Sequence, residues 1–185
     1  ARVIHISVAD GETIPYKIEN KNELLKLCTT TAYKTTTEDK ANFKQKLNEK
    51  YTKKYVLTKD IDLTGENIYP IGFYLLEVKG PFTDSQEYVY QSFTGSFSGE
   101  FEIDGVKNNY SITGINFDVN KRYVNNINDG LSQKSSFVGL FAKNEGTIEN
   151  LNVVYSRVSI NAFSIEYQLG KENANLSYNL YFGGI

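Results

Sequence analysis

The stretch Ile112-Thr113-Gly114-Ile115-Asn116-Phe117 decides the predicted fold, because it returns 36 residues later as Ile148-Glu149-Asn150-Leu151-Asn152-Val153. Gly114 and Asn150 occupy the same position of the two copies, and Gly and Asn are the residues that most readily take a positive φ. Both copies can therefore make the same left-handed corner between two short strands. A repeated unit of this kind is typical of a solenoid, in which each coil stacks on its neighbours.

A second pair of segments repeats with a different spacing. Phe137-Val138-Gly139-Leu140-Phe141 returns 44 residues later as Tyr181-Phe182-Gly183-Gly184-Ile185. Unequal spacings indicate coils with a similar core and loops of variable length. From Tyr55 onward, short apolar runs alternate with Gly, Asn, Asp and Ser, and no helical period appears. We therefore predict a right-handed parallel β-helix of two to three coils over residues 55–185, with structural turns at Gly95, Gly99, Gly114, Gly139, Asn150 and Gly183.

Residues 1–54 have a different pattern. Val3–Val8 and Ile14–Ile18 alternate as short strands do, and Asn22 can cap a helix that runs through Cys28. A second helix is predicted to begin at Thr35 or Thr36, with a solvated lysine face and an apolar stripe of Phe43, Leu47 and Tyr51. This region is predicted to be an α/β cap over one end of the β-helix, because an uncovered end would expose unpaired backbone and apolar core.

The composition narrows the class of protein. The chain has 185 residues, enough for one domain, with 40% hydrophobic residues and a net charge of -2. This charge gives no electrostatic case for a nucleic-acid partner. A membrane-spanning helix needs about 20 apolar residues, and no such run is present, so we predict no membrane span. The first residue is Ala and no signal peptide is visible, as expected of a mature, trimmed or excised fragment.

Few residues could carry chemistry. The chain has one His and one Cys, so the usual zinc ligand sets cannot be assembled, and we predict no metal, no cofactor and no catalytic residue. A Ser-His-Asp site would need His5, which the alternation of Val3–Val8 places on the solvent face. Asp60 and Asp62 project to the same side of a strand. They could hold calcium or act as an acid/base pair, or they could face solvent and accept hydrogen bonds from turn amides.

Several motifs resemble a known family. Ile18–Leu27 is similar to the opening helix of a bacterial surface module, and Tyr55–Leu63, followed by Tyr69–Gly72, resembles its Y-x-L-x-x-D-I-D-L … P-I-G segment. Phe93–Gly99 resembles its F-x-G-x-F-D-G turn, and Phe137–Leu151 resembles the GLUG-type repeat. The family is the right-handed β-helix of bacterial adhesins and of the N-terminal region of IgA-protease-type metalloproteases. The resemblance implies an extracellular or cell-surface location. The chain departs from the family at Phe101–Ile112, which is longer than the family's turn.

Three long insertions are the predicted binding surfaces, at residues 73–92, 120–136 and 161–179. Exposed tyrosines on the loops of a rigid scaffold are suited to binding, although tyrosines can also simply cover the sides of a solenoid. The predicted partner-binding residues are Tyr74, Tyr88, Tyr90, Tyr123, Tyr167 and Tyr178.

The sequence therefore predicts a non-catalytic structural and adhesive module of a larger bacterial surface or secreted protein, which binds a host protein or a glycan. An accessory N-terminal region of a secreted metalloprotease and a carbohydrate-active β-helix enzyme are the alternatives. Tyr181–Ile185 would open a new coil, so we also expect the remainder of a parent protein, or a second chain, to pair with this C-terminal edge.

Overall fold

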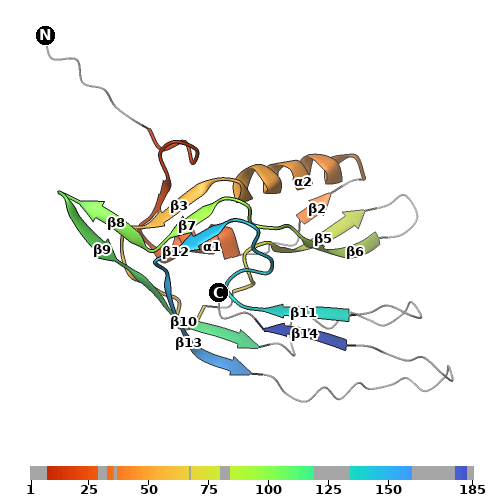
Figure 1. The fold of residues 1–185 in the computed structure, drawn as a ribbon. Helices are drawn as coiled ribbons and strands as arrows, with labels where there is room; N and C mark the ends of the chain where they lie inside the picture. The colour runs from red at the N-terminus through yellow and green to blue at the C-terminus, as the bar shows by residue number, and fades with distance from the viewer. Residues whose placement is uncertain are drawn as a thin grey trace, which may run out of the picture.

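The computed structural model describes residues 8–28, 33–35, 37–66, 68–79, 84–118, 134–159 and 178–182 (Figure 1). The two helices of this part are α1 (Lys21–Cys28) and α2 (Thr37–Tyr51). The strands are β1 (Tyr16–Ile18), β2 (Tyr33–Thr35), β3 (Lys54–Leu57), β4 (Ile61–Asp62), β5 (Phe73–Lys79), β6 (Asp84–Tyr90), β7 (Ser96–Ser98), β8 (Glu100–Ile103), β9 (Val106–Asn109), β10 (Ser111–Asp118), β11 (Lys134–Val138), β12 (Thr147–Glu149), β13 (Asn152–Ser159) and β14 (Tyr178–Phe182).

Two parallel sheets form the centre of the molecule. One has the strand order β1-β3-β7-β12 and the other β13-β10-β4, so strands that are distant in the sequence lie side by side. In the first sheet, Tyr55 pairs with Tyr16 on one side and with Phe97 on the other, and Ile148 pairs with Phe97. Tyr55 and Phe97 of this row are buried in the core, whereas Tyr16 on the edge strand is 38% exposed.

The core lies between these sheets and is rich in aromatic rings. Tyr55 and Phe97 stack with ring centroids 6.5 Å apart, and Phe93 and Phe141 lie 5.1 Å apart. On the other sheet, Ile61, Ile112 and Ile115 are almost fully buried. Burial of such side chains is worth about 1.5–3 kcal/mol each, so this cluster supplies much of the stability of the fold.

The helices close one side of the core. In α1, Leu24, Leu27 and Cys28 are buried. In α2, Leu47 and Tyr51 are buried, which confirms the apolar stripe predicted for this helix. The N-cap is Asn20 rather than the predicted Asn22, because the Asn20 Oδ1 accepts a hydrogen bond from the Glu23 amide at 3.2 Å. The predicted strand Val3–Val8 lies almost entirely outside the described residues, and so does His5.

Two antiparallel hairpins interrupt the parallel arrangement. β5 and β6 pair along their whole length, and β2 adds to β5 in parallel. β8 and β9 pair from Glu100–Asn109 to Ile103–Val106. Both hairpins lie where the sequence predicts loops or an extended turn.

The predicted right-handed parallel β-helix is wrong. The described part of the chain is a mixed α/β fold with five sheets of two to four strands, two of which contain an antiparallel hairpin, and no solenoid is seen in it. The sequence predicts that its short apolar runs form successive sides of similar coils. Residues 100–109, which include one of these runs, instead fold back on themselves, as do residues 73–90 of the first predicted insertion, because local antiparallel pairing satisfies their backbone without a distant partner.

The 36-residue repeat is also wrong as a structural alignment. Ile112 pairs with Val153 rather than aligning with Ile148, and Ile148 pairs with Phe97. The two copies of the pattern have different structures. Gly114 lies inside β10, where the pairing with β13 is irregular, whereas Asn150 makes the corner between β12 and β13. The 44-residue repeat does match the structure, because Phe137 pairs with Tyr181 and Val138 with Phe182.

Candidate functional site

The β8–β9 hairpin has the most distinctive exposed surface among the described residues. Its two strands are joined by Asp104 and Gly105, with φ of 51° and 79°. Positive φ at both central residues defines the hairpin turn whose twist matches that of the flanking strands, and Asp-Gly is a preferred sequence for it. The turn is therefore well formed, and it holds the two strands at a fixed register.

Ile103 and Val106 flank this turn and lie directly opposite each other. Their exposed fractions are 45% and 61%. Cross-strand partners have Cβ atoms about 4.5–5.5 Å apart, so the two side chains form one small aliphatic surface. Exposed Val and Ile next to each other at a hairpin tip lose hydrophobic stabilisation that a binding partner could restore.

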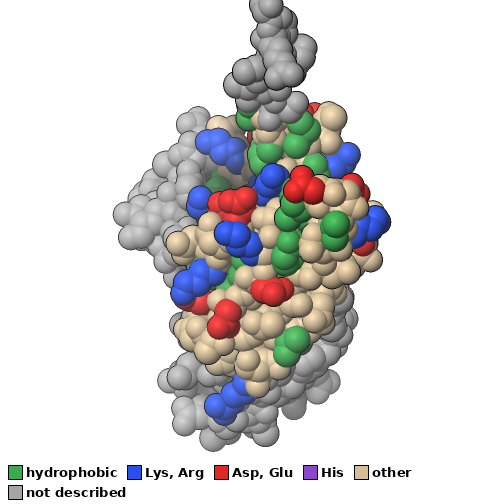
Figure 2. All heavy atoms as spheres, turned by 90° about the vertical axis from the view of Figure 1, so that its left-hand side faces the viewer, with side chains coloured by type: hydrophobic (Ala, Val, Ile, Leu, Met, Phe, Trp, Pro, Cys, Tyr) green, Lys and Arg blue, Asp and Glu red, His purple; other side chains and the backbone are tan. Residues whose placement is uncertain are grey.

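Charged side chains lie on the opposite face of the hairpin from the aliphatic pair, because successive side chains of a strand point to opposite faces. The Lys107 Nζ forms an ion pair with Glu100 at 2.6 Å, and the hydrogen bond and charge of Glu100 raise the pKa of Lys107. The negative charges of Glu102 and Glu149 contribute to the same shift. Figure 2 views the molecule from the side on which the hairpin extends in Figure 1, and it shows hydrophobic side chains among Lys, Arg, Asp and Glu. The tip of the hairpin therefore has an apolar face, and its other face is charged.

The base of the hairpin is anchored to the rest of the fold. The Tyr110 amide donates to the Gly99 carbonyl at 2.7 Å, and the Glu100 amide donates to the Ser98 Oγ at 3.1 Å. The Lys17 ammonium lies 4.8 Å from the centre of the Phe101 ring. These contacts tie β8 to β1 and β7, so the tip projects from a fixed base.

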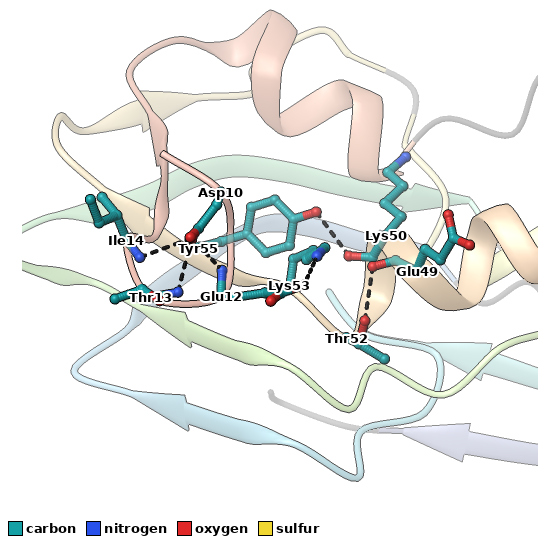
Figure 3. A network of polar contacts seen from close by, with 9 residues as sticks. All are labelled: Asp10, Glu12, Thr13, Ile14, Glu49, Lys50, Thr52, Lys53 and Tyr55. Carbon is teal, nitrogen blue, oxygen red and sulfur yellow. Dashed lines mark hydrogen bonds and ion pairs between the residues drawn. The ribbon is translucent and has the colours of Figure 1, made fainter. Parts of the chain in front are cut away.

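A second polar cluster joins the N-terminal turn to the end of α2 (Figure 3). The Asp10 carboxylate accepts hydrogen bonds from the amides of Glu12, Thr13 and Ile14 at 2.8–3.0 Å, which lower its pKa. The Glu12 carboxylate pairs with the Lys53 ammonium at 2.5 Å. The Tyr55 hydroxyl donates to the Lys50 carbonyl at 2.9 Å. These contacts stabilise the local structure, and the cluster holds residues 10–14 against the junction between α2 and β3.

Three of the six predicted binding tyrosines lie on the hairpin formed by β5 and β6. Tyr74, Tyr88 and Tyr90 lie on β5 and β6 rather than on a loop, with Tyr74 opposite Val89 and Tyr88 opposite Leu75. Tyr178 is the first residue of β14. Tyr123 and Tyr167 lie outside the described residues. A binding role for these tyrosines stays a prediction.

The residues predicted at equivalent turns have different structural roles. Gly114 and Asn150 have positive φ, of 74° and 50°, but they do not stack on each other. The carbonyl oxygen of Asn150 lies 2.1 Å from where a Cβ on Gly99 would be, and Gly114 faces Asp62 and Thr64. Gly95 allows a close backbone contact with Lys53. Gly139 is buried, and Gly183 lies outside the described residues.

The two aspartates of the β4 segment accept turn amides, as one of the two interpretations predicted. The Asp60 Oδ1 accepts from the Ser111 amide and the Asp62 Oδ1 from the Thr64 amide, both at 2.8 Å. Hydrogen bonds from the Thr64 hydroxyl and amide lower the pKa of Asp62, and the charge of Lys21 contributes less. Within the described ranges, no three His, Cys, Asp or Glu side chains are placed to hold a metal ion.

Cys28, the last residue of α1, and Lys50, near the end of α2, lie close enough to interact electrostatically. Burial raises the pKa of the Cys28 thiol to about 12. The Lys50 ammonium donates to the Lys26 carbonyl, and burial lowers its pKa. Lys50 is therefore an exception to the solvated lysine face predicted for this helix.

Sequence reasoning missed Ile103 and Val106, although a signal was present. Asp104-Gly105 between apolar residues is a strong hairpin pattern, and it lies in the segment that departs from the adhesin-like motif. Among the described helices, none is long and apolar enough to cross a membrane. The chain matches no protein-family model, no curated protein and no solved structure.

Proposed function

We propose that this chain is a non-catalytic structural and adhesive module of a larger surface or secreted protein, and that the tip of the β8–β9 hairpin contacts a protein partner. The observation that carries the proposal is the exposed aliphatic pair Ile103 and Val106, held opposite each other by a well-formed turn. A rigid hairpin loses little conformational entropy on binding, so even a small apolar contact can contribute to affinity.

The chemistry of the tip favours a protein over a glycan. Sugar rings are usually recognised by stacking on aromatic side chains, and the residues of the tip from Glu102 to Lys107 include no aromatic ring. Two adjacent aliphatic side chains suit an apolar pocket on a protein. Glu100, Glu102 and Lys107 lie on the other face of the hairpin, away from this contact.

The inventory of reactive groups supports binding rather than catalysis. The buried Cys28 thiol, with a pKa of about 12, stays protonated at neutral pH and is a poor nucleophile. Asp60 and Asp62 are engaged by backbone amides of their own chain. His5 is the one histidine of the sequence.

The test is a binding screen on two supports. Purified extracellular-matrix proteins and a glycan array would be probed with the wild type, with the double variant Ile103→Lys, Val106→Lys, and with Val8→Lys as a matched control. Val8 is a hydrophobic residue exposed by 75% at a different place.

We expect saturable binding to a matrix protein that weakens about tenfold or more in the hairpin variant and is unchanged in the control. Circular dichroism would establish that the variants fold. Saturable binding to glycans alone, equal binding by the hairpin variant, or no saturable binding on either support would contradict the proposal.

A further inference from the structure

The turn of the β8–β9 hairpin contains an aspartate followed by a glycine, a pair that can rearrange covalently. The backbone nitrogen of the second residue can bond to the side-chain carboxyl carbon of the first, which closes a five-membered ring. Glycine in the second position favours this reaction because it has no Cβ to hinder the approach. The sequence has three such pairs, Asp10-Gly11, Asp104-Gly105 and Asp129-Gly130. The structure describes the first two, whereas the third lies outside the described residues.

Asp104 and Gly105 are both exposed and have room to change conformation. No atom lies within 4 Å of the position that a Cβ on Gly105 would take. In a two-residue turn the flanking residues, here Ile103 and Val106, exchange the hydrogen bonds of the ladder, which leaves the Gly105 nitrogen outside it. Within the described part of the chain, no hydrogen bond or ion pair holds the Asp104 carboxylate.

The same pair of residue types at Asp10-Gly11 is held in place. The Asp10 carboxylate accepts hydrogen bonds from three backbone amides of the turn that follows, at 2.8–3.0 Å (Figure 3). These bonds, above all the one from the Glu12 amide, lower the pKa of Asp10 and keep the carboxylate ionised, a form that is a poor electrophile. The Gly11 amide donates to the Ile14 carbonyl at 2.9 Å, and a Cβ on Gly11 would lie 2.4 Å from the Tyr16 ring.

We propose that Asp104 is a site at which the folded protein forms isoaspartate, whereas Asp10 is protected. In the first step the Gly105 nitrogen bonds to the side-chain carboxyl carbon of Asp104, and the carboxyl hydroxyl and the amide hydrogen leave as one water molecule. In the second step a water molecule opens the ring. Cleavage at the side-chain carbonyl restores aspartate. Cleavage at the main-chain carbonyl leaves the chain linked through the side chain, with no net change in composition.

The position of Asp104 favours the first step, in which the turn must open so that the nitrogen can reach the carboxyl carbon. β8 and β9 form a sheet of two strands, so the tip opens more readily than strands of the central sheets. Asp104 has a φ of 51°, a conformation that a residue with a Cβ seldom adopts, and opening relieves it. At Asp10, in contrast, opening would break three hydrogen bonds to a carboxylate.

The modification would change the shape of the hairpin tip. Isoaspartate adds one carbon to the main chain between Ile103 and Val106, and a two-residue turn of this type cannot keep the same register with the longer chain. The two aliphatic side chains would then no longer lie opposite each other. An effect on partner binding rests on the function proposed above, whereas the chemistry at Asp104 does not.

The experiment measures isoaspartate at each pair separately. The folded wild type is incubated in warm, mildly acidic buffer, and a parallel sample is unfolded in guanidinium chloride. Trypsin then places the three pairs on different peptides, residues 3–17, 80–107 and 123–134, and electron-transfer fragmentation distinguishes isoaspartate from aspartate. In the folded protein we expect isoaspartate to form at least about tenfold faster at Asp104 than at Asp10. In the unfolded sample the two rates should be similar, because the hydrogen bonds that protect Asp10 are lost.

Gly105→Ala is the matched control, since the fold has room for the new Cβ but the methyl group hinders the approach of the nitrogen. It should slow the reaction at Asp104 and leave Asp10 unchanged. Three results would overturn the proposal. They are no isoaspartate at Asp104 in the folded protein, equal rates at Asp104 and Asp10 in the folded protein, and a preference for Asp104 that stays the same after unfolding. The measurement uses no binding partner, so it is independent of the proposed function.

Discussion

Gly95 lies against the backbone of Lys53 so closely that a Cβ on Gly95 would sit 1.9 Å from the Lys53 carbonyl oxygen. The next strand repeats the contact, because a Cβ on Gly146 would lie 2.2 Å from the Gly95 carbonyl oxygen. A backbone hydrogen bond joins the same segments, because the Thr147 amide donates to the Gly95 carbonyl oxygen at 2.9 Å. Glycine is required at this corner for close approach, which lets successive strands of the β1-β3-β7-β12 sheet pair.

The first prediction is that Gly95→Ala destabilises the fold by about 3 kcal/mol or more, because the new methyl group overlaps backbone that cannot rotate away. Gly105→Ala is the matched control. Gly105 has a φ of 79°, and no atom lies within 4 Å of an added Cβ. Gly105→Ala should therefore lower the free energy of unfolding by only about 1 kcal/mol, from the backbone conformation alone. Urea unfolding of the two variants measures the difference, and equal losses would show that the close contact is not present.

The second prediction concerns Thr58, whose hydroxyl is buried and has no hydrogen-bond partner among the described residues. Replacing it with Val keeps the shape and removes an unsatisfied polar group. We expect Thr58→Val to be neutral or stabilising by up to about 1 kcal/mol. Thr58→Ser keeps the hydroxyl and loses a methyl group, so it should destabilise. A loss of stability in Thr58→Val would mean that the hydroxyl has a partner, such as a buried water.

The third prediction is a pH dependence from Asp62. Its pKa in the folded state is lowered, so the carboxylate stabilises the fold fully above the pKa of an unfolded Asp, about 3.9. This contribution is lost as the pH falls through the lower, folded pKa. Asp62→Asn keeps an oxygen acceptor and removes the titration.

The measurement is urea unfolding of the wild type and Asp62→Asn at a series of pH values. The stability difference should be largest near neutral pH and disappear below the folded pKa. Asp104→Asn is the control on the exposed hairpin turn. A difference that does not change between neutral and strongly acidic pH would show that the ionised form of Asp62 has no advantage in the fold.

The features that sequence patterns predicted are local ones. The apolar stripe that includes Leu47 follows from helical periodicity, and the outward direction of Asp60 and Asp62 follows from strand alternation. The pairing of Ile112 with Val153 cannot be predicted from such local patterns, because contacts between distant segments set the register of parallel strands. The same limit applies to the candidate site. Asp104-Gly105 indicated a turn, but whether Ile103 and Val106 are covered depends on the rest of the fold.

The last prediction separates the two residues that the sequence placed in equivalent corners. Gly114 and Asn150 both have positive φ, but a Cβ on Gly114 would lie 2.4 Å from the Thr64 nitrogen and 2.6 Å from the Asp62 Oδ1. Gly114→Ala should therefore cost about 3 kcal/mol, from strain at positive φ and from overlap with β4 and the residues after it. Asn150 already has a Cβ and is exposed, so Asn150→Ala loses only the tolerance of Asn for this conformation, about 1 kcal/mol. Thermal or urea unfolding measures the stability of both variants. If the two variants lose the same stability, the result would support equivalent corners at Gly114 and Asn150 and would contradict the pairing of Ile112 with Val153.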